Sequence, residues 1–282
     1  MEDIYAKFIK TKDISFKYAK GMRDIFGKEI HTYHEIFFFI GGEAEFISEA
    51  GKEKLVPNTT VIIPKETFHQ FVVRSSETEY HRCVFNFDVV AELEELIAKK
   101  FDRIILMQDD AMTELFRKMI SLVESPLGQP ETNILMKALF AQILITIEDE
   151  PNRALEYSAL NTITKEALAC INRYPNRNLT VAYLADSLHI SSSHLAHVFK
   201  KDLHISIHKY ILEKRLILAN KKIKNSVNPT QAAAECGFHD YSGFYRQYKK
   251  MFGLSPAAVF GQQSCAEAPG QNNVFPSSQF DT

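Results

Sequence analysis

Residues 229–256 read PTQAAAECGFHDYSGFYRQYKKMFGLSP, and this stretch predicts two short helices joined by a tight turn. Thr230 stands before a helix-favouring run and is a candidate for the N-cap of the first helix. Gly237 supplies the backbone freedom that the turn needs, and His239 and Asp240 offer a cap for the second helix. The stretch therefore has the order of elements of a helix-turn-helix.

The second helix of this stretch separates aromatic from polar side chains. Phe244, Tyr248 and Phe252 recur at helical spacing and are expected to face inward. The outward face carries Tyr241, Ser242, Tyr245, Arg246, Lys249 and Lys250. Side chains of these types meet base edges and phosphates in the major groove of DNA. A DNA-reading helix and an amphipathic hairpin with a solvated outer face both fit this pattern.

A second copy of the pattern lies at residues 179–201, LTVAYLADSLHISSSHLAHVFKK, at an offset of about 48 residues. Ser191 is the predicted cap of its second helix, and Leu195 and Phe199 are expected inside. The outward face carries Ser192, Ser193, Ala196, His197, Lys200 and Lys201. Between the copies, residues 205–223 predict one continuous helix with a basic flank. The repetition favours the DNA-reading interpretation over the solvated hairpin.

The two outward faces divide into base-reading and phosphate-binding side chains. We expect contacts to base edges from Ser193, Ala196 and His197 in the first copy and from Tyr241, Ser242, Tyr245 and Arg246 in the second. We expect contacts to phosphates from Lys200, Lys201, Lys249 and Lys250. Arg246 is the best candidate for a guanine contact, because a guanidinium can donate two hydrogen bonds to the guanine edge.

Two such units on one connecting helix resemble the DNA-binding domain of the AraC/XylS family of transcription regulators. The match rests on Leu184-Ala185, Ser191, Leu195, Phe199-Lys200-Lys201, Ala233, Gly237-Phe238, Phe244, Arg246, Lys249 and Phe252-Gly253-x-Ser255-Pro256. The chain departs from the family pattern at Ala234, Cys236 and Phe260, which lie off the reading face. The resemblance implies a transcription regulator, not an enzyme, with double-stranded DNA, RNA polymerase and a second copy of the chain as partners.

Charge is divided unevenly along the 282 residues, which suffice for two domains with their own cores. Residues 158–262 carry 14 Lys and Arg against 6 Asp and Glu, whereas residues 1–157 carry 19 against 27. The basic excess lies where DNA binding is expected, and it predicts an affinity that falls steeply with salt. A solvated basic surface gives the same counts, so the charge supports the DNA-binding interpretation without proving it.

Location and thiol state follow from what the sequence lacks. No apolar run approaches the length that spans a membrane, and the N-terminal residues do not read as a signal peptide, so we expect a cytoplasmic protein that does not bind membranes. The four cysteines, at positions 83, 170, 236 and 265, show no paired metal-binding spacing. Free thiols are therefore expected.

The first part of the chain predicts β structure. From residue 4 to 87, short runs rich in Phe, Val, Ile and Tyr alternate with turn residues. The run 36–40 is almost wholly apolar, which fits a strand buried on both faces, and a hairpin is predicted around Gly51-Lys52. Many short strands at this spacing predict a sandwich or a small barrel.

Helical periodicity follows the strands, at residues 89–101, 111–123 and 132–147. In the last of these, an apolar stripe is predicted from Leu135, Ala138, Leu139, Ile143 and Ile147. The stripe can pack on its own barrel, and we favour the interpretation that it also pairs with a second subunit, since regulators that read two-fold sites are commonly dimers.

The expected fold class is α+β with two domains. We expect a cupin-like β-barrel with trailing helices over residues 1–150 and a linker over 151–157. An all-α DNA-binding domain is expected over 158–260, with helix-turn-helix units at about 179–201 and 229–252 and a first helix at 162–174. Residues 261–282 are small and polar, and we expect them to be a disordered tail.

The β region resembles a cupin, as the sensor half of this family often does. The first pattern is His31-x-x-x-Glu35-x-x-x-x-x-x-Gly42, with Glu29 where the cupin motif has its first His. The second is Asn58-x-x-x-x-x-Pro64-x-Glu66-x-x-His69, in which Asn and Glu replace two glycines. Tyr80-x-Arg82-x-x-x-Asn86-Phe87-Asp88 resembles the strand that closes the sensor barrel. The resemblance implies a barrel whose mouth binds a small molecule.

Two kinds of site are compatible with these residues. Glu29, His31, Glu35 and His69 are the side chains that would hold Fe(II), Mn(II) or Zn(II) in an enzyme. We favour instead a pocket without metal or cofactor, in which polar groups and aromatic walls bind a sugar or another polyol. Its residues would be His31, Glu35, His69 and Arg82, with Phe37, Phe39 and Phe71 as walls.

Three alternatives stay open beside a sugar-controlled regulator. They are a regulator without an effector, a regulator that responds to stress or virulence cues, and a metal-dependent cupin enzyme. The sequence contains no Gly-rich phosphate loop, no Gly-x-Ser-x-Gly and no His-Glu-x-x-His, so it offers no catalytic motif for an enzyme.

Overall fold

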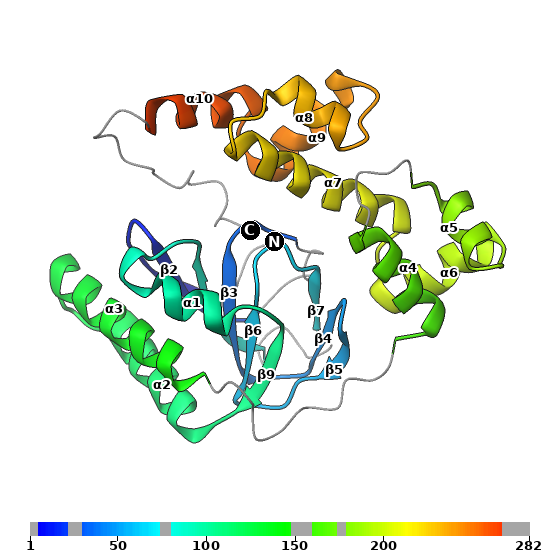
Figure 1. Ribbon diagram of the computed structural model, residues 1–282. Coiled ribbons are helices and arrows are strands. Elements are labelled where there is room, and N and C mark those ends of the chain that lie inside the picture. Colours follow the sequence, from blue (N-terminus) through cyan, green and yellow to red (C-terminus); the bar gives the residue numbers. More distant parts are fainter. Residues whose placement is uncertain (1–4, 22–29, 74–79, 148–159, 174–178, 267–282) are drawn as a thin grey trace. The chain divides into compact units, whose positions relative to one another are not determined.

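The computed structural model describes residues 5–21, 30–73, 80–147, 160–173 and 179–266, and it divides the chain into two compact units. The first unit, Met1–Ala159, combines two β-sheets with helices, and the second, Leu160–Thr282, is formed by helices in its described part (Figure 1). The predicted α+β class with two domains is confirmed.

The first unit contains two antiparallel sheets. The larger sheet has the order β1 (Tyr5–Lys10), β2 (Ile14–Lys20), β8 (His81–Phe87), β3 (His34–Gly41), β6 (Thr59–Ile63) and β9 (Ile105–Gln108). The smaller sheet has the order β5 (Gly51–Lys54), β4 (Ala44–Ser48) and β7 (His69–Val73). Apolar side chains from β3, β6 and β9 meet those of β4 and β7 in one buried cluster, so the two sheets face each other.

Strand β3 lies in the middle of the larger sheet, between β8 and β6. Phe37 and Phe39 point into the cluster between the sheets, and Ile36 and Phe38 point into a second cluster under the helices. Alternate side chains of a strand face opposite sides, which explains why a strand covered on both faces is apolar throughout. The predicted double burial of residues 36–40 is confirmed, with Ile40 only half-buried at the end of the run.

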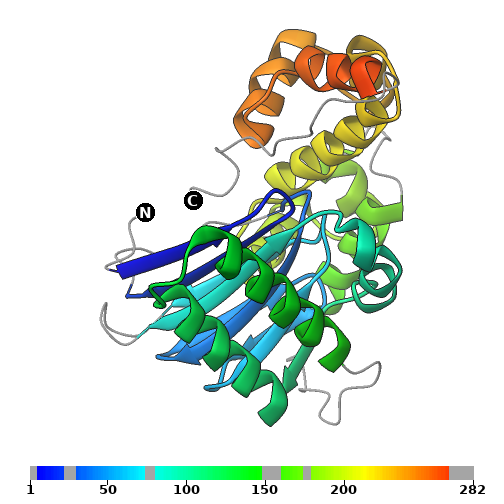
Figure 2. The ribbon, with the colours of Figure 1, turned by 90° about the vertical axis from the view of Figure 1, so that its left-hand side faces the viewer.

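Three helices cover the outer face of the larger sheet. They are α1 (Glu94–Lys100), which follows a 3-10 turn at Ala91–Leu93, α2 (Asp110–Val123) and α3 (Gln129–Thr146). Figure 2 shows α2 and α3 lying across the strands. The rings of Phe38 and Phe116 are parallel to within 3° with centroids 4.3 Å apart, so a side chain of β3 stacks directly on one of α2.

The structure corrects three details of the first unit. The β4–β5 hairpin turns at Glu49–Ala50, and Gly51-Lys52 belong to β5 instead of the turn. Strand β9 was not predicted; it pairs with β6. Helix α3 begins at Gln129 and buries Met136, Phe140, Ile143 and Leu144, and Ile147 is buried directly after it, whereas Leu135 and Ala138 of the predicted stripe are exposed.

The second unit contains seven helices in its described part. They are α4 (Thr162–Arg173), α5 (Val181–Ser187), α6 (Ser192–Leu203), α7 (Ile207–Lys224), α8 (Pro229–Glu235), α9 (Tyr241–Phe252) and α10 (Pro256–Ala266). Helix α5 packs on α6, α8 packs on α9, and α7 lies between the two pairs in the chain. Both predicted helix-turn-helix units and the continuous helix that connects them are present.

Some segment bounds of the second unit differ from the predicted ones. Helix α10 continues to Ala266, so residues 261–266 are helical and not part of a disordered tail. The rest of the predicted tail and the predicted linker 151–157 lie outside the described residues, as does Glu29. Within the described ranges, no helix is long and apolar enough to cross a membrane. Cys83, Cys170 and Cys236 are free thiols, as expected.

Candidate functional site

Each helix of the two helix-turn-helix units begins at a polar cap. Thr180 Oγ1 accepts a hydrogen bond from the amide of Tyr183 at 3.0 Å, and Ser191 Oγ accepts one from His194 at 3.2 Å. Asp240 accepts bonds from the amides of Ser242 and Gly243, at 3.0 and 2.8 Å. These caps satisfy amide groups that have no partner in the helix itself, and they fix where each helix starts. The caps predicted at Ser191 and Asp240 are confirmed, and Thr180 is the cap of α5.

The cap predicted at Thr230 is wrong, because Asn228 holds that position. Asn228 Oδ1 accepts a hydrogen bond of 3.0 Å from the amide of Thr230, and Pro229 occupies the first turn. Proline is favoured there because its missing N–H is one that the first turn would leave without a helical partner. The signal that locates the cap is therefore the Asn-Pro pair rather than the hydroxyl that follows it.

The two inter-helix turns share one backbone conformation. Ile190 donates to the carbonyl of Ala185 and Phe238 to that of Ala233, both at 3.0 Å. The residue before each donor has a left-handed backbone, with φ of 55° at His189 and 80° at Gly237. This is the Schellman arrangement in which a helix ends at a left-handed residue. In the second turn this left-handed position is occupied by Gly237. In the first turn it is occupied by His189, whose β-carbon makes the same backbone conformation strained.

The second turn is one residue longer than the first. The left-handed residues are 48 positions apart, but the caps Ser191 and Asp240 are 49 apart, because His239 is inserted before the second cap. The offset of the reading helices is therefore 49 and not 48. With this offset, the buried residues Leu195, Phe199 and Leu203 of α6 match Phe244, Tyr248 and Phe252 of α9.

The predicted DNA-binding residues lie on the outer faces of α6 and α9. Eleven of the twelve are exposed, and Ala196 is half-buried: Ser192, Ser193, Ala196, His197, Lys200, Lys201, Tyr241, Ser242, Tyr245, Arg246, Lys249 and Lys250. In α9, Ser242, Arg246 and Lys249 follow helical spacing and share one side. Both helices therefore present hydroxyl, aromatic and basic groups to the surface while their apolar residues are buried. His194 and Tyr183, which the sequence analysis did not select, are exposed beside them.

Side chains of helix α7 contact the turn and both helices of the second helix-turn-helix. Arg215 Nη1 donates to the carbonyl of Gly237 at 3.4 Å, and Lys222 forms an ion pair with Glu235 of α8 at 2.5 Å. Tyr248 donates a buried hydrogen bond to Asn220 at 2.6 Å. These contacts bind α8 and α9 to α7, so the second helix-turn-helix is fixed to the connecting helix.

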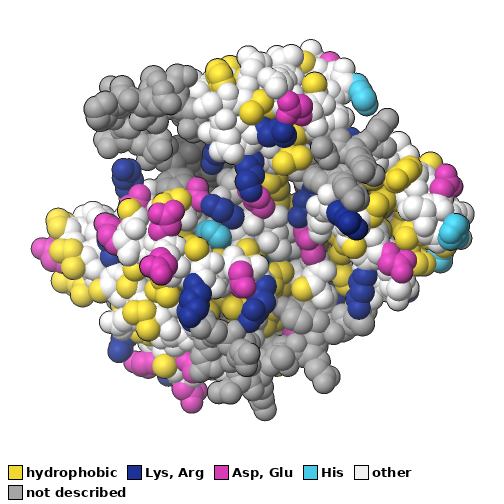
Figure 3. Space-filling model, viewed as in Figure 1, with side chains coloured by type: hydrophobic (Ala, Val, Ile, Leu, Met, Phe, Trp, Pro, Cys, Tyr) yellow, Lys and Arg dark blue, Asp and Glu magenta, His cyan; other side chains and the backbone are white. Residues whose placement is uncertain are grey.

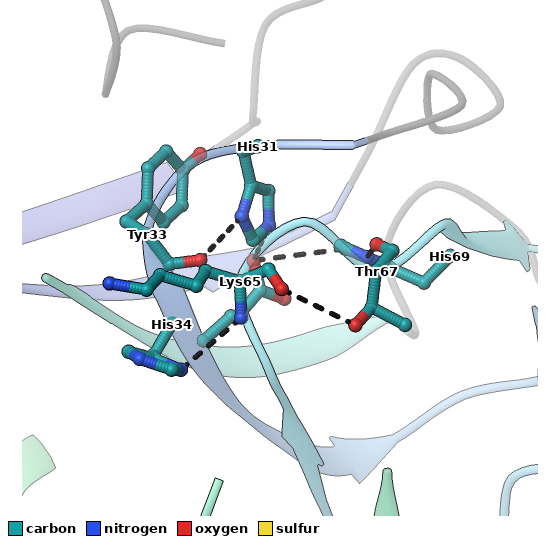
Figure 4. Close-up of polar contacts among 7 residues, drawn as sticks. His31, Tyr33, His34, Lys65, Thr67 and His69 are labelled. Atoms are coloured by element: carbon teal, nitrogen blue, oxygen red, sulfur yellow. Dashed lines mark hydrogen bonds and ion pairs between the residues drawn. The ribbon is translucent and has the colours of Figure 1, made fainter. Parts of the chain in front are cut away.

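In the first unit, the structure brings together three of the side chains that the cupin resemblance selected. His31 precedes β3, Glu35 lies on β3, and His69 begins β7. Their ligand atoms all lie within 4.8 Å of one another. Figure 4 shows the two histidines and the backbone carbonyls of Tyr33 and Thr67 that contact them.

Aromatic side chains lie beside this cluster. Phe37 and Phe71 stack with centroids 3.8 Å apart, and the rings of Phe46 and His69 are 6.4 Å apart. Phe39 and Arg82 are register partners on β3 and β8, and both are buried. The predicted pocket residues other than His31 thus lie on strands β3, β7 and β8, and His31 lies directly before β3.

Burial shifts the pKa of two side chains of the cluster, His69 and Glu35. It lowers the pKa of His69 to about 4, against a smaller opposing effect of Glu35, so His69 is neutral at pH 7. Burial also raises the pKa of Glu35, and the nearby His69 and Arg82 act in the opposite direction. These are the shifts expected when charged forms are removed from water.

Two further residues of this region were not selected from the sequence. Asn86 lies opposite Glu35 in the β3–β8 register, and its Oδ1 is buried without a hydrogen-bond partner among the described residues. His34 accepts a hydrogen bond at Nδ1 from the amide of Lys65 at 3.2 Å, and burial lowers its pKa to about 4. Asn86 was present in the closing-strand pattern, but only the pairing of β3 with β8 places it beside Glu35.

The comparisons with known proteins agree with this arrangement. A family model described as a helix-turn-helix domain matches residues 184–262. The probable transcriptional regulator LumQ of Photobacterium leiognathi is 24% identical over 231 residues, covering 80% of this chain and 88% of that protein. The Msm operon regulatory protein of Streptococcus mutans is 23% identical over 242 residues, covering 82% of this chain and 85% of that protein.

A third relative has a higher sequence identity over a shorter region. The HTH-type transcriptional regulator AlkR of Acinetobacter baylyi is 32% identical over 126 residues, covering 43% of this chain and 41% of that protein. All three relatives are named as regulators, in agreement with the prediction that the chain is not an enzyme. The second unit thus carries the helix-turn-helix domain of AraC-type regulators, and the chain is similar over most of its length to DNA-binding transcriptional regulators.

Proposed function

We propose that α6 and α9 read two neighbouring major-groove segments of an operator. The observation that carries this proposal is the repetition of the capped, outward-facing helix, with eleven of its twelve predicted contact residues exposed. Ser193, Ala196 and His197 on α6 and Tyr241, Ser242, Tyr245 and Arg246 on α9 contact base edges in this proposal. The basic side chains Lys200, Lys201, Lys249 and Lys250 contact phosphates.

One connecting helix imposes a spacing on the operator. Two reading helices that enter the same face of DNA must lie about 34 Å apart, the length of one helical turn, unless the DNA bends towards them. The operator therefore has two short conserved segments about one turn apart. We place this activity in the cytoplasm, with RNA polymerase as the further partner of the regulator.

We further propose that the first unit binds a small polar effector, such as a sugar, between its sheets. The support is a group of buried polar side chains among stacked rings: His31, Glu35, His69 and Arg82 beside Phe37, Phe39 and Phe71. Polyols suit such sites because hydroxyl groups pair with the polar side chains while the ring faces stack on aromatic walls.

A second copy of the chain is the partner that fits α3. Ile134 and Ile145 are 68% and 69% exposed, and their spacing of three helical turns puts them on one side of the helix. A groove between α2 and α3, lined by Ala111, Leu115 and Ile145, adjoins this side. Figure 3 shows hydrophobic side chains grouped over the α2–α3 region at the left. Dimerisation through α3 removes this apolar surface from water.

The experiment that tests the proposed function is a DNA-binding titration of the full chain across a salt series, with and without a panel of sugars. The proposal requires sequence-selective binding that weakens steeply with salt, and one sugar that shifts the affinity. Selective binding that no sugar alters would keep the DNA-reading role and favour a regulator without a sugar effector. Binding that is the same for all sequences would contradict the assignment of the reading helices.

A further inference from the structure

The two reading helices, α6 and α9, can be compared residue by residue. Each has twelve residues and begins directly after a capping side chain, Ser191 or Asp240. Each buries the fourth, eighth and twelfth residues after its cap. Each ends at a left-handed residue, His204 with φ of 53° or Gly253 with φ of 72°. A residue of α6 therefore corresponds to the residue 49 positions later in α9.

Three exposed positions carry the same residue in both helices. They are one serine near the start and two lysines in the last turn: Ser193 and Ser242, Lys200 and Lys249, Lys201 and Lys250. A lysine contact to a phosphate positions a helix on DNA but carries no sequence information. These shared residues can hold both helices on the DNA in the same way, but they cannot distinguish one operator segment from the other.

Four positions in the first half of each helix carry different residues. The N-terminal residues of a reading helix are the ones that contact base edges. Besides the shared serine and the buried fourth residue, every position of this half differs between the helices. The pairs are Ser192 and Tyr241, His194 and Gly243, Ala196 and Tyr245, and His197 and Arg246.

The differences place bulky side chains on opposite sides of the two helices. The first and fifth positions lie one turn apart on one side. In α9 they hold Tyr241 and Tyr245, which are 38% and 37% exposed, whereas α6 has only a serine and an alanine there. The third position lies on the other side, since it is about 160–200° away around the helix axis. There α6 has the exposed ring of His194, and α9 has Gly243 without a side chain.

The third position is also linked to the cap of each helix. Asp240 Oδ2 accepts a hydrogen bond of 2.8 Å from the amide of Gly243, and a β-carbon added to Gly243 would lie only 2.8 Å from this oxygen. In α6 the smaller cap Ser191 accepts one bond of 3.2 Å, from the amide of His194, which carries a full side chain. The missing side chain in α9 therefore goes together with its two-bond aspartate cap.

We propose that the four differing pairs give α6 and α9 different base preferences, with His194 as a further base-reading residue of α6. The proposal rests on the DNA-reading role of both helices. Arg246 can donate two hydrogen bonds to guanine, whereas a histidine ring nitrogen donates or accepts one. Ala196 offers a methyl group to thymine in the place where α9 has a tyrosine. The two operator segments therefore differ at the bases that face the first half of each helix.

The test exchanges these residues and selects operators from random DNA with the full chain. The exchange variant carries the residues of α9 on α6: Ser192→Tyr, His194→Gly, Ala196→Tyr and His197→Arg. The wild type should enrich two different segments, and the exchange variant should enrich the α9 segment twice. Its affinity for this doubled operator should exceed its affinity for the wild-type operator by at least about tenfold. The salt dependence should stay that of the wild type, because all four lysines are retained.

Two further variants serve as controls. Lys200→Ala should select the wild-type operator with a salt slope that is smaller by about 1, because it removes a phosphate contact only. The reverse exchange, Tyr241→Ser, Tyr245→Ala and Arg246→His, places smaller side chains at exposed positions of α9. It tests the proposal even if circular dichroism shows that the first exchange variant does not fold. It should lose the α9 segment and keep the α6 segment.

The newly assigned residue is tested alone by His194→Ala, which should relax the preference at one base pair of the α6 segment. An unchanged preference would overturn its assignment. The proposal as a whole is overturned if a folded exchange variant still selects the wild-type operator, or if the wild type enriches two identical segments. A wild type that enriches no sequence would instead refute the DNA-reading role itself.

Discussion

The hydroxyl group of Tyr248 donates a hydrogen bond of 2.6 Å to Oδ1 of Asn220, and this bond joins the reading helix α9 to the connecting helix α7. Tyr248 is 0% exposed and Asn220 is 5% exposed. Burial raises the pKa of Tyr248 above its usual value of about 10, so the hydroxyl keeps its proton at pH 7 and can donate it. The orientation of α9 is therefore fixed from inside the unit, by a polar contact that water does not reach.

Tyr248→Phe should destabilise the second unit by about 1–3 kcal/mol, because it leaves the buried Asn220 oxygen without its donor. Denaturant unfolding followed by circular dichroism measures the change. Tyr245→Phe is the control, since Tyr245 lies on the same helix with its side chain 37% exposed, and it should change stability by less than about 0.5 kcal/mol. Equal effects of the two substitutions would show that the buried bond contributes nothing.

Gly237→Ala should destabilise the second unit by about 1–2 kcal/mol, because a side chain at this left-handed position is strained. The added β-carbon would also lie 3.3 Å from Cζ of Arg215. His189→Ala is the matched control in the first turn, where φ is 55° and a β-carbon is already present. It should leave the free energy of unfolding within about 0.5 kcal/mol of the wild type. A loss as large as that of Gly237→Ala would contradict the proposed cause.

Acid should destabilise the first unit through His34. Its pKa is lowered to about 4 from 6.5 in the folded chain, mainly by burial, so the unfolded chain binds a proton first as the pH falls. The stability contributed by neutral His34 is complete above pH 6.5 and is lost as the pH falls towards 4. The slope is at most about 1.4 kcal/mol per pH unit. His34→Gln should show a shallower loss between pH 7 and 5, and an identical loss would refute this role.

Ile134→Glu combined with Ile145→Glu should convert a dimer of the full chain into a monomer, because two charges would enter the proposed α3 contact. Light scattering after size-exclusion chromatography measures the mass. Val89→Glu is the control, since Val89 is 50% exposed in the same unit but lies outside α3. A wild-type chain that is monomeric at high concentration, or a double variant that remains dimeric, would contradict the contact.

The elements that the sequence predicts well are those whose signals are local. Thr180, Ser191 and Asp240 lie directly before the helices that they cap, and Gly237 lies at the turn it permits. The cap at Asn228 was missed because the hydroxyl of Thr230 gave a competing signal two residues later. Because of the extra residue His239, helix α9 begins 49 positions after α6 and not 48. The same residues of α9 are on its outer face as predicted.

The errors concern contacts between distant parts of the chain. Strand β9 is only four residues long, and its identity as a strand comes from its pairing with β6. Helix α3 is apolar on more than one side, so periodicity could not separate the buried Met136 and Phe140 from the exposed Ile134. For the cluster, the cupin-like patterns grouped His31, Glu35 and His69, and the folded sheets bring their ligand atoms within 4.8 Å of one another.

The most direct test of the central claim is selection of preferred operators from random DNA by the wild type and by Arg246→Ala. The account predicts that the wild type enriches two short segments about one helical turn apart. Arg246→Ala should lose about 1–3 kcal/mol of discrimination at one base pair, whereas Lys249→Ala should weaken all sequences alike. If the wild type enriched no sequence, or if Arg246→Ala weakened every sequence equally, the assignment of α9 as a base-reading helix would be contradicted.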